Sequence, residues 1–206
     1  MKGKLTVLVM AMAMVFLAVT AGLAAKVLFE DKFTALDPSW GAPGDIISAK
    51  DGKLIITADK NTAQAHLNQA NILPNDMEAS YTVAFVKAGS PNNGSGLIFW
   101  AKDNDNCYIL LTNPNGSFAV PRYASGRYLL PVAWREDASI KKGEGAENQV
   151  KVVTKGNQAT IFINGKEVVS FAGQPPEGGS EIGFKVNSGP EGSNSVAFSN
   201  FQVVEP

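Results

Sequence analysis

Apolar and polar residues from residue 27 onward form short runs, some alternating and some wholly apolar, with turn-forming residues between them. No stretch after residue 25 shows the period of an amphipathic helix. Short runs at close spacing are typical of an antiparallel sandwich or barrel, so the sequence predicts an all-β protein. The predicted strands are Val27–Phe33, Ile46–Ala49, Lys53–Ala58, Ala63–Asn68, Met77–Val86, Gly96–Lys102, Cys107–Thr112, Ser117–Tyr123, Gln149–Thr154, Gln158–Ile163, Lys166–Phe171, Glu181–Val186 and Val196–Val204.

The clearest pattern covers residues 148–171, where three runs rich in β-branched and aromatic residues are joined by two short turns. The turns are Gly156–Asn157 and Asn164–Gly165. Gly and Asn tolerate the positive φ angles that a tight hairpin requires, so this segment predicts a three-stranded antiparallel meander. The longest irregular stretch is predicted at Ser125–Glu147, and a loop of this length in a compact β domain is often functional.

The first 25 residues have the order of a secretory signal peptide. Lys2 and Lys4 precede the apolar stretch Leu5–Leu23, and small residues follow it. A membrane anchor is the alternative, because the apolar stretch is long enough to span a bilayer. Cleavage near residue 25 would leave a single domain, 26–206, that is secreted or periplasmic and has no remaining membrane segment.

Charge and cysteine content limit the classes of partner and of reaction that the sequence supports. Without Lys2 and Lys4, the chain has 16 Lys and Arg residues and 19 Asp and Glu residues, so its net charge is mildly negative. No basic stripe is present, which argues against nucleic acid as a partner. Cys107 is the only cysteine, so it cannot form an internal disulfide. Its apolar strand favours a buried, inert thiol over a nucleophile.

Three segments resemble a known family: the hairpin Val152–Val168, the run Glu181–Gly183 and the final V-x-F-S-N-F-x-V at Val196–Val203. They are similar to the concanavalin-A-like jelly rolls of bacterial secreted proteins. The nearest group is the 3-keto-disaccharide hydrolase domain family, also described as glycoside-hydrolase-family-16-like. The resemblance implies a two-sheet antiparallel jelly-roll sandwich whose first and last strands lie side by side. It also implies a carbohydrate ligand.

Three common catalytic motifs are missing from the sequence. Family-16 glucanases that share the implied fold carry E-x-D-x-E on one strand, which places two carboxylates on one face of the sheet. This sequence has no such strand, and it contains neither H-E-x-x-H nor G-x-S-x-G. Retaining hydrolysis by the family-16 motif is therefore not expected.

The run Ser95–Lys102 resembles a recurrent pattern of the family, with Trp100 at the place where arginine is usual. Alternation predicts that Leu97, Phe99 and Ala101 face the core and that Trp100 faces the other way. A tryptophan on the concave face would stack on the C–H face of a pyranose. The alternative is that Trp100 packs under a loop.

A second group of candidate residues combines aromatic rings with all three arginines of the chain. Aromatic faces and guanidinium donors together suit a polyhydroxylated ligand. Ordinary packing of a long loop is the alternative interpretation. The candidates are Arg122, Tyr123, Arg127, Tyr128, Trp134 and Arg135, with Glu136 beside them.

His66, the single histidine, lies in an alternating run with Gln64 and Asn68 on the same face. It is either part of a solvated strand face or a hydrogen-bonding member of a sugar site, with a possible role as general base. The run Asp103–Asn106 suggests calcium ligands, although a turn capped by its own side chains is favoured. The resemblance also allows a structural calcium near Asp31.

The expected function is that of a secreted, monomeric carbohydrate-binding jelly roll. An enzyme acting on glycosides or 3-keto-glycosides is one alternative, and a non-catalytic structural or interaction module of the cell envelope is another. The absence of paired carboxylates on one strand favours binding, whereas the family resemblance favours an enzyme.

Overall fold

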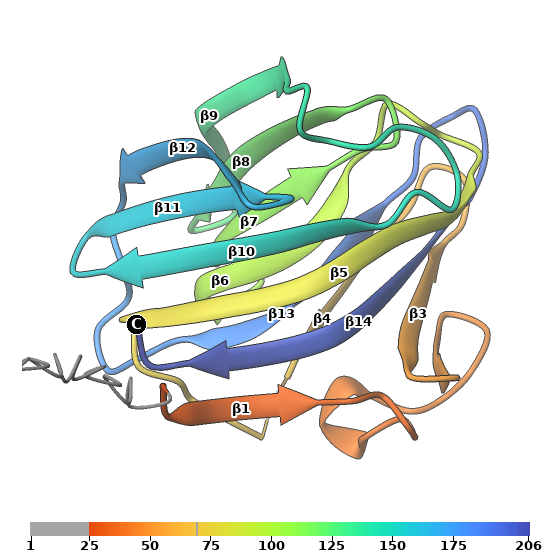
Figure 1. Ribbon diagram of the computed structural model, residues 1–206. Coiled ribbons are helices and arrows are strands. Elements are labelled where there is room, and N and C mark those ends of the chain that lie inside the picture. Colours follow the sequence, from red (N-terminus) through yellow and green to blue (C-terminus); the bar gives the residue numbers. More distant parts are fainter. Residues whose placement is uncertain (1–24, 69) are drawn as a thin grey trace, which may run out of the picture.

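The computed structural model describes residues 25–68 and 70–206, which form two antiparallel β-sheets that face each other (Figure 1). The predicted signal peptide therefore falls outside the described residues, except for Ala25. The eight-stranded sheet consists of β1 (Val27–Asp31), β2 (Ile47–Lys50), β3 (Lys53–Ala58), β5 (Met77–Ala88), β10 (Asn148–Lys155), β11 (Gln158–Ile163), β12 (Lys166–Ala172) and β14 (Asn194–Val204). The six-stranded sheet consists of β4 (Ala63–Leu67), β6 (Ser95–Asp103), β7 (Asn106–Thr112), β8 (Ser117–Ala124), β9 (Arg127–Glu136) and β13 (Glu181–Asn187).

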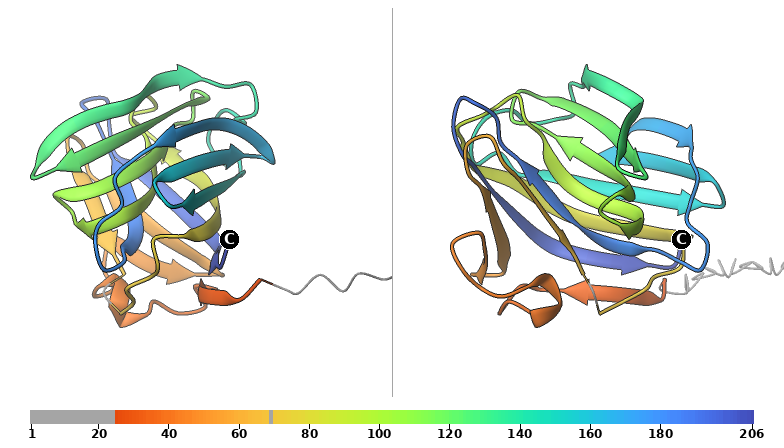
Figure 2. Two further views of the ribbon diagram at one scale, coloured as in Figure 1. Left: turned by 90° about the vertical axis from the view of Figure 1, so that its left-hand side faces the viewer. Right: turned by 180° about the vertical axis from the view of Figure 1, so that it is seen from behind.

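The strand order shows how the chain moves between the sheets. The eight-stranded sheet has the order β12-β11-β10-β5-β14-β3-β2, with β1 also paired to β14, and the six-stranded sheet has the order β4-β13-β6-β7-β8-β9. Figure 2 shows the same layers from the side and from behind. The first strand pairs antiparallel with the last, with Glu30 opposite Gln202. The expected all-β jelly-roll sandwich, with its two end strands adjacent, is confirmed.

Aromatic residues hold the two sheets together. Phe184 of the six-stranded sheet stacks on Phe198 of the eight-stranded sheet, with ring centroids 4.1 Å apart and an interplanar angle of 20°. Trp40, from the short 3-10 helix Pro38–Trp40, stacks on the same Phe184 ring and is 2 % exposed. Inward-facing side chains of both sheets thus interdigitate, which is the usual basis of sandwich stability.

The predicted meander is present as β10, β11 and β12. Asn164 has a φ angle of +50° and Gly165 one of +81°, as the turn chemistry requires. The Asn164 side chain reinforces the turn by accepting a hydrogen bond from the Gln149 amide and donating to the carbonyl oxygen of Ser139.

The prediction of an irregular stretch at Ser125–Glu147 is wrong for its first half, because Arg127–Glu136 forms strand β9. Ser125 and Gly126, with φ angles of +52° and +73°, make the tight turn between β8 and β9. Nearly all residues of β9 are exposed, and Pro131 lies within it. An edge strand of this kind lacks the apolar alternation by which strands are recognised, and proline is tolerated there.

Among the described residues, no helix is long and apolar enough to cross a membrane.

Candidate functional site

The outer face of the six-stranded sheet carries a second apolar cluster, separate from the main core. Along β7, Tyr108 and Leu110 point into the core, whereas Ile109 and Leu111 point outward. Ile109 nevertheless has an exposed fraction of only 1 %. Because these outward side chains are buried, neighbouring side chains must cover them and project beyond the sheet surface. The outer face is therefore hollowed and not an open sheet surface.

A hollow of about 410 Å³ lies directly above Ile109 and Leu111. One wall carries the aromatic side chains of Tyr123, Tyr128 and Trp134 from the β8–β9 hairpin. We call this hollow the aromatic groove. The opposite wall comes from Lys185 and Asn187 of β13. Further polar residues come from two loops: Asn92 and Asn93 from the loop before β6, and Asn61 from the turn between β3 and β4.

The aromatic wall results from strand pairing. Tyr123 and Tyr128 lie directly opposite each other across the β8–β9 hairpin, and their rings meet edge to face at 5.7 Å between centroids. Trp134 stands farther along β9 and rests on the backbone of Gly94, where a Cβ atom would come within 2.5 Å of the indole. Tyr128 is 54 % exposed and Trp134 38 %, so both rings are available to a ligand.

The hydroxyl of Tyr128 stays a proton donor at neutral pH. Partial burial and the neighbouring Tyr123 raise the pKa of Tyr128 above its ordinary value. Among the described residues, neither this hydroxyl nor the indole N–H of Trp134 has a hydrogen-bond partner within the protein. The aromatic wall therefore offers both flat apolar faces and free donors.

Lys185 of β13 reaches across the groove floor. Its ammonium lies 4.5 Å from the centre of the Tyr123 ring and 3.4 Å from the Tyr123 hydroxyl oxygen. The residue is half-buried, so its side chain covers part of the apolar floor.

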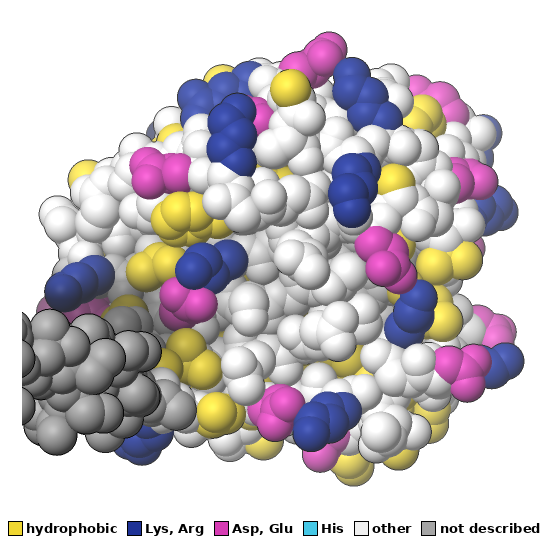
Figure 3. All heavy atoms as spheres, in the orientation of Figure 1, with side chains coloured by type: hydrophobic (Ala, Val, Ile, Leu, Met, Phe, Trp, Pro, Cys, Tyr) yellow, Lys and Arg dark blue, Asp and Glu magenta, His cyan; other side chains and the backbone are white. Residues whose placement is uncertain are grey.

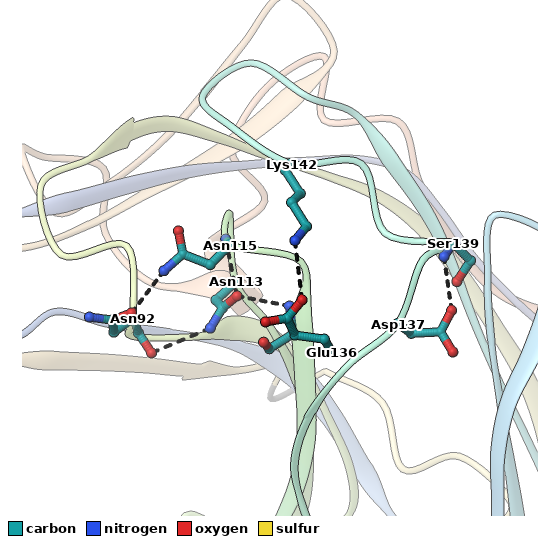
Figure 4. A network of polar contacts seen from close by, with 8 residues as sticks. Asn92, Asn113, Asn115, Glu136, Asp137, Ser139 and Lys142 are labelled. Carbon is teal, nitrogen blue, oxygen red and sulfur yellow. Dashed lines mark hydrogen bonds and ion pairs between the residues drawn. The ribbon is translucent and has the colours of Figure 1, made fainter.

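Asparagine side chains fix the loop at the end of the groove (Figure 4). Asn115 donates a hydrogen bond from Nδ2 to Oδ1 of Asn92 at 2.8 Å, which ties this loop to the β7–β8 turn. From the other side, Asn187 donates to the carbonyl oxygen of Gly94 at 2.7 Å. In the same view, Lys142 pairs with Glu136 at the end of β9. These contacts hold the groove end in place before any ligand arrives.

The three arginines do not line the groove, contrary to expectation. Arg122 lies over the ring of the core residue Tyr108 at 5.2 Å, and Arg135 lies over Phe118 at 4.8 Å and donates to the carbonyl oxygen of Val168. Adjacent residues of a strand point to opposite faces, so Arg122 and Arg135 cannot share a face with Tyr123 and Trp134. Arg127 is exposed at the start of β9 and is not among the groove residues.

Trp100 is a core residue and does not lie on an open face, although it lines a hollow of about 470 Å³ together with Arg122 and Tyr123. Phe99 and Trp100 together lie opposite Ile182, between the pairs Ile98–Gly183 and Ala101–Glu181. This β-bulge, with a φ angle of +46° at Trp100, turns the indole inward. Trp100 is 1 % exposed, and its Nε1 donates to the carbonyl oxygen of Asn75 at 3.1 Å. Of the two interpretations, packing is the one that the structure supports.

His66 lies in a different hollow, next to Trp40 and Glu181. Its Nδ1 is 3.2 Å from the carbonyl oxygen of Trp40, whereas its Nε2 is shielded from solvent and has no hydrogen-bond partner in residues 25–68 and 70–206. Burial lowers the pKa of His66, and the hydrogen bond to Trp40 only partly opposes this shift. The ring is thus a neutral, half-buried group, with one nitrogen at the Trp40 carbonyl and the other closed off from solvent.

The acidic turn Asp103–Asn106 is held by its own side chains. Asp103 accepts hydrogen bonds from the Asp105 amide and from Nδ2 of Asn106. The carboxylate of Asp31 is likewise occupied by the Phe33 amide and the Trp40 indole. No group of three or more His, Cys, Asp or Glu residues in the described part of the chain is arranged to hold a metal ion. A structural calcium stays a prediction.

Cys107 behaves as the sequence predicts. It lies in the outer apolar cluster, 3 % exposed, and burial raises the pKa of its thiol to about 11. A thiol with such a pKa carries almost no thiolate at neutral pH and is a poor nucleophile.

Sequence reasoning missed the polar wall of the groove, above all Lys185 and Asn187. A signal was available, because the run Glu181–Asn187 alternates apolar and polar residues and so places both side chains on one face. No local pattern could have predicted that Asn92 and Asn93 lie at the groove, because long-range contacts place their loop there.

The outer face of the eight-stranded sheet is different in character (Figure 3). Most charged side chains lie toward its margins, and uncharged polar residues and backbone occupy the middle. A hollow of about 500 Å³ on this face is lined by two aromatic residues, of which Tyr81 is buried in the core. The other is Phe162, and the ammonium of Lys151 lies 5.1 Å from the centre of its ring. The aromatic groove is therefore the stronger candidate site.

Comparison with protein families identifies the relatives of this chain. The model of the 3-keto-alpha-glucoside-1,2-lyase-like domain matches residues 24–204. The chain belongs to this family. The predicted resemblance is thereby confirmed over nearly the whole length. A search of curated protein sequences finds no match.

Solved structures of the same fold share little sequence with this lyase-like domain. Carbohydrate binding module CBM66 from Bacillus subtilis is 14 % identical with a TM-score of 0.52, and the match covers 79 % of this chain and 89 % of that one. The Emp47p carbohydrate recognition domain is 13 % identical with a TM-score of 0.60, covering 85 % and 96 %. A chain described with endo-acting O-glycanases of the human gut microbiota is 10 % identical with a TM-score of 0.60, covering 88 % and 100 %. At these identities the likeness concerns the fold.

Proposed function

We propose that the protein binds carbohydrate in the aromatic groove and that it does so as a secreted or periplasmic protein. The observation that carries the proposal is the pair of exposed aromatic faces of Tyr128 and Trp134, whose hydroxyl and indole donors have no partner among the described residues. Export is supported by the signal-like order of residues 1–25.

The groove matches the two-sided chemistry of a sugar. The C–H face of a pyranose is apolar and stacks on aromatic rings, while its hydroxyl groups need donors and acceptors at the edges. Trp134 and Tyr128 provide the flat surfaces, and Asn93 and Asn187 are placed to meet hydroxyl groups along the rim. The names of two structural neighbours, a carbohydrate binding module and a carbohydrate recognition domain, support the same function.

The groove favours binding over catalysis. Its lining residues in the described part of the chain include no Asp, Glu or His, so the two carboxylates of a glycosidase have no counterpart there. His66, the only histidine, lies outside the groove, with one nitrogen at the Trp40 carbonyl and the other closed off from solvent. We therefore propose a binding protein within a family named for lyase activity.

A glycan array followed by calorimetry tests the proposal. Trp134→Ala should weaken binding of an identified glycan by about 1–3 kcal/mol, because a large anchoring contact is lost. Phe162→Ala is the matched control, since it removes an aromatic ring from the other sheet. No bound glycan on the array, or unchanged affinity in Trp134→Ala, would contradict the proposal.

The enzyme alternative is tested separately, by incubating the wild-type protein with a 3-keto-glycoside and following release of the aglycone. Release above the rate of a blank without protein would show that the chain is catalytic after all.

A further inference from the structure

Among the described residues that line the aromatic groove, Lys185 has the only charged side chain. Other lysines of the described chain, such as Lys151 and Lys166, form ion pairs with carboxylates. Lys185 has no carboxylate within ion-pair distance in residues 25–68 and 70–206. The remaining residues, 1–24 and Gln69, contain no Asp or Glu and so supply no carboxylate for Lys185. The groove therefore carries one positive charge that the protein itself does not neutralise.

The surroundings make this ammonium attract an anion more strongly than an exposed lysine would. Lys185 is half-buried over Ile109, Leu111 and the face of Tyr123. Water is partly excluded there, so the effective dielectric constant is lower and an opposite charge is attracted more strongly than at the open surface. The Tyr123 ring offers only a weak substitute for a counter-ion.

The hydrogen-bond arrangement also favours an anion. An ammonium has three N–H donors, of which one is directed to the Tyr123 hydroxyl oxygen. Because that oxygen accepts from Lys185, the hydroxyl hydrogen of Tyr123 is free to donate elsewhere. Two remaining ammonium hydrogens and one phenolic hydrogen can thus converge on a ligand oxygen that carries negative charge, and charge-assisted hydrogen bonds are the stronger kind.

We infer that the groove selects anionic sugars, whose carboxylate or sulfate group pairs with Lys185 while the sugar ring stacks on Tyr128 or Trp134. This inference rests on the proposed carbohydrate binding and specifies its ligand class. Neutral glycans could stack equally well, but they would leave the half-buried ammonium without a counter-ion.

The test compares charged and neutral forms of one sugar. The protein is applied to an array of neutral and acidic glycans that includes three probes. These are a galacturonate oligomer, its fully methyl-esterified form of equal length, and a sulfated galactose oligomer. We expect bound glycans to be acidic. The two charged probes show whether a carboxylate or a sulfate is preferred. Lys185→Met, which keeps the apolar stem, should weaken acidic ligands by roughly tenfold or more, the scale of a lost charge-assisted hydrogen bond. Lys185→Arg should retain most of the affinity.

Lys155→Met is the control for overall charge, because Lys155 is exposed on β10, forms no ion pair within the described residues and lies on the other sheet. Binding to acidic ligands should also weaken as salt rises, and that salt dependence should shrink in Lys185→Met but not in Lys155→Met. If the protein binds only neutral glycans, or if Lys185→Met binds acidic ones unchanged, the inference is overturned while carbohydrate binding stands. If no glycan binds at all, the proposed function fails and the inference fails with it.

Discussion

The three tryptophans show how one side chain serves packing at some positions and recognition at another. Trp40 and Trp100 are buried, and each donates its indole N–H to a protein oxygen, the carboxylate of Asp31 and the carbonyl of Asn75 respectively. The indole N–H of Trp134 has no hydrogen-bond partner in residues 25–68 and 70–206, and its ring face is exposed. Burial with a satisfied donor indicates a structural role, whereas an exposed ring with an unpartnered donor indicates a contact surface.

Trp100→Ala should destabilise the fold by about 3–5 kcal/mol, the usual cost of removing a large buried aromatic side chain. The indole packs on Gly173 and against Tyr108, so its removal leaves a cavity that these neighbours cannot fill. Chemical denaturation measures the loss. Trp134→Ala, measured alongside, should change the free energy of unfolding far less, and equal losses in both variants would mean that Trp134 is also structural.

His66 should make stability depend on pH in mildly acidic solution. Burial lowers the pKa of His66 in the folded state, so the unfolded chain takes up its proton more readily. Stability is then complete above the ordinary histidine pKa of about 6.5 and falls as pH drops below it. Because His66 is the only histidine, His66→Gln should flatten the profile of melting temperature between about pH 7 and pH 5. An unchanged slope in the variant would assign the dependence to other groups.

At the scale of elements, local sequence sets the tight turns, whereas long-range pairing sets edge strands and bulges. The β11–β12 turn is set locally by Asn164 and Gly165, and the sequence was sufficient to place it. Strand β9 was missed, because its pairing with β8 and not its own residue pattern makes it a strand. The bulge that turns Trp100 inward likewise depends on the register of β6 against β13.

Gly165→Val should strain the β11–β12 turn by about 1–3 kcal/mol. Gly165 has a φ angle of +81°, and no atom would contact an added Cβ, so the cost is backbone strain alone. A thermal melt measures it. Gly44→Val is a suitable control, since Gly44 also lies in open space but does not have a φ in this unfavourable range. Equal melting temperatures for the Gly165 variant and the parent would contradict the turn assignment.

At the scale of the whole molecule, the outer faces of the two sheets differ in character. The eight-stranded sheet closes the sandwich by pairing β1 with β14 and presents a largely uncharged polar surface. The six-stranded sheet carries the aromatic groove on its outer apolar cluster. The inner face of the six strands thus packs in the sandwich core, and the outer face carries the groove proposed to bind the ligand.

The exported protein should begin between Gly22 and Val27, because signal peptidases cleave after small residues at the end of the apolar stretch. Strand β1 starts at Val27, so cleavage there leaves its pairing with β14 intact. Intact-mass spectrometry of the extracellular or periplasmic fraction provides the measurement. A purified exported protein that still carries Met1 would contradict removal of the segment and favour the membrane-anchor alternative.

The sequence by itself determined the features that arise from neighbouring residues: the β-only pattern, the turns at Gly156–Asn157 and Asn164–Gly165, and the inert environment of Cys107. It also brought Tyr123, Tyr128 and Trp134 to attention. Only the tertiary structure decided which candidates share a surface, because that depends on strand register. Register turned Trp100 and two arginines away from the groove and brought Lys185 into it from a strand more than 50 residues away in the chain. A shift of one residue moves a side chain to the opposite face, and such a shift is set by long-range pairing that local patterns do not contain.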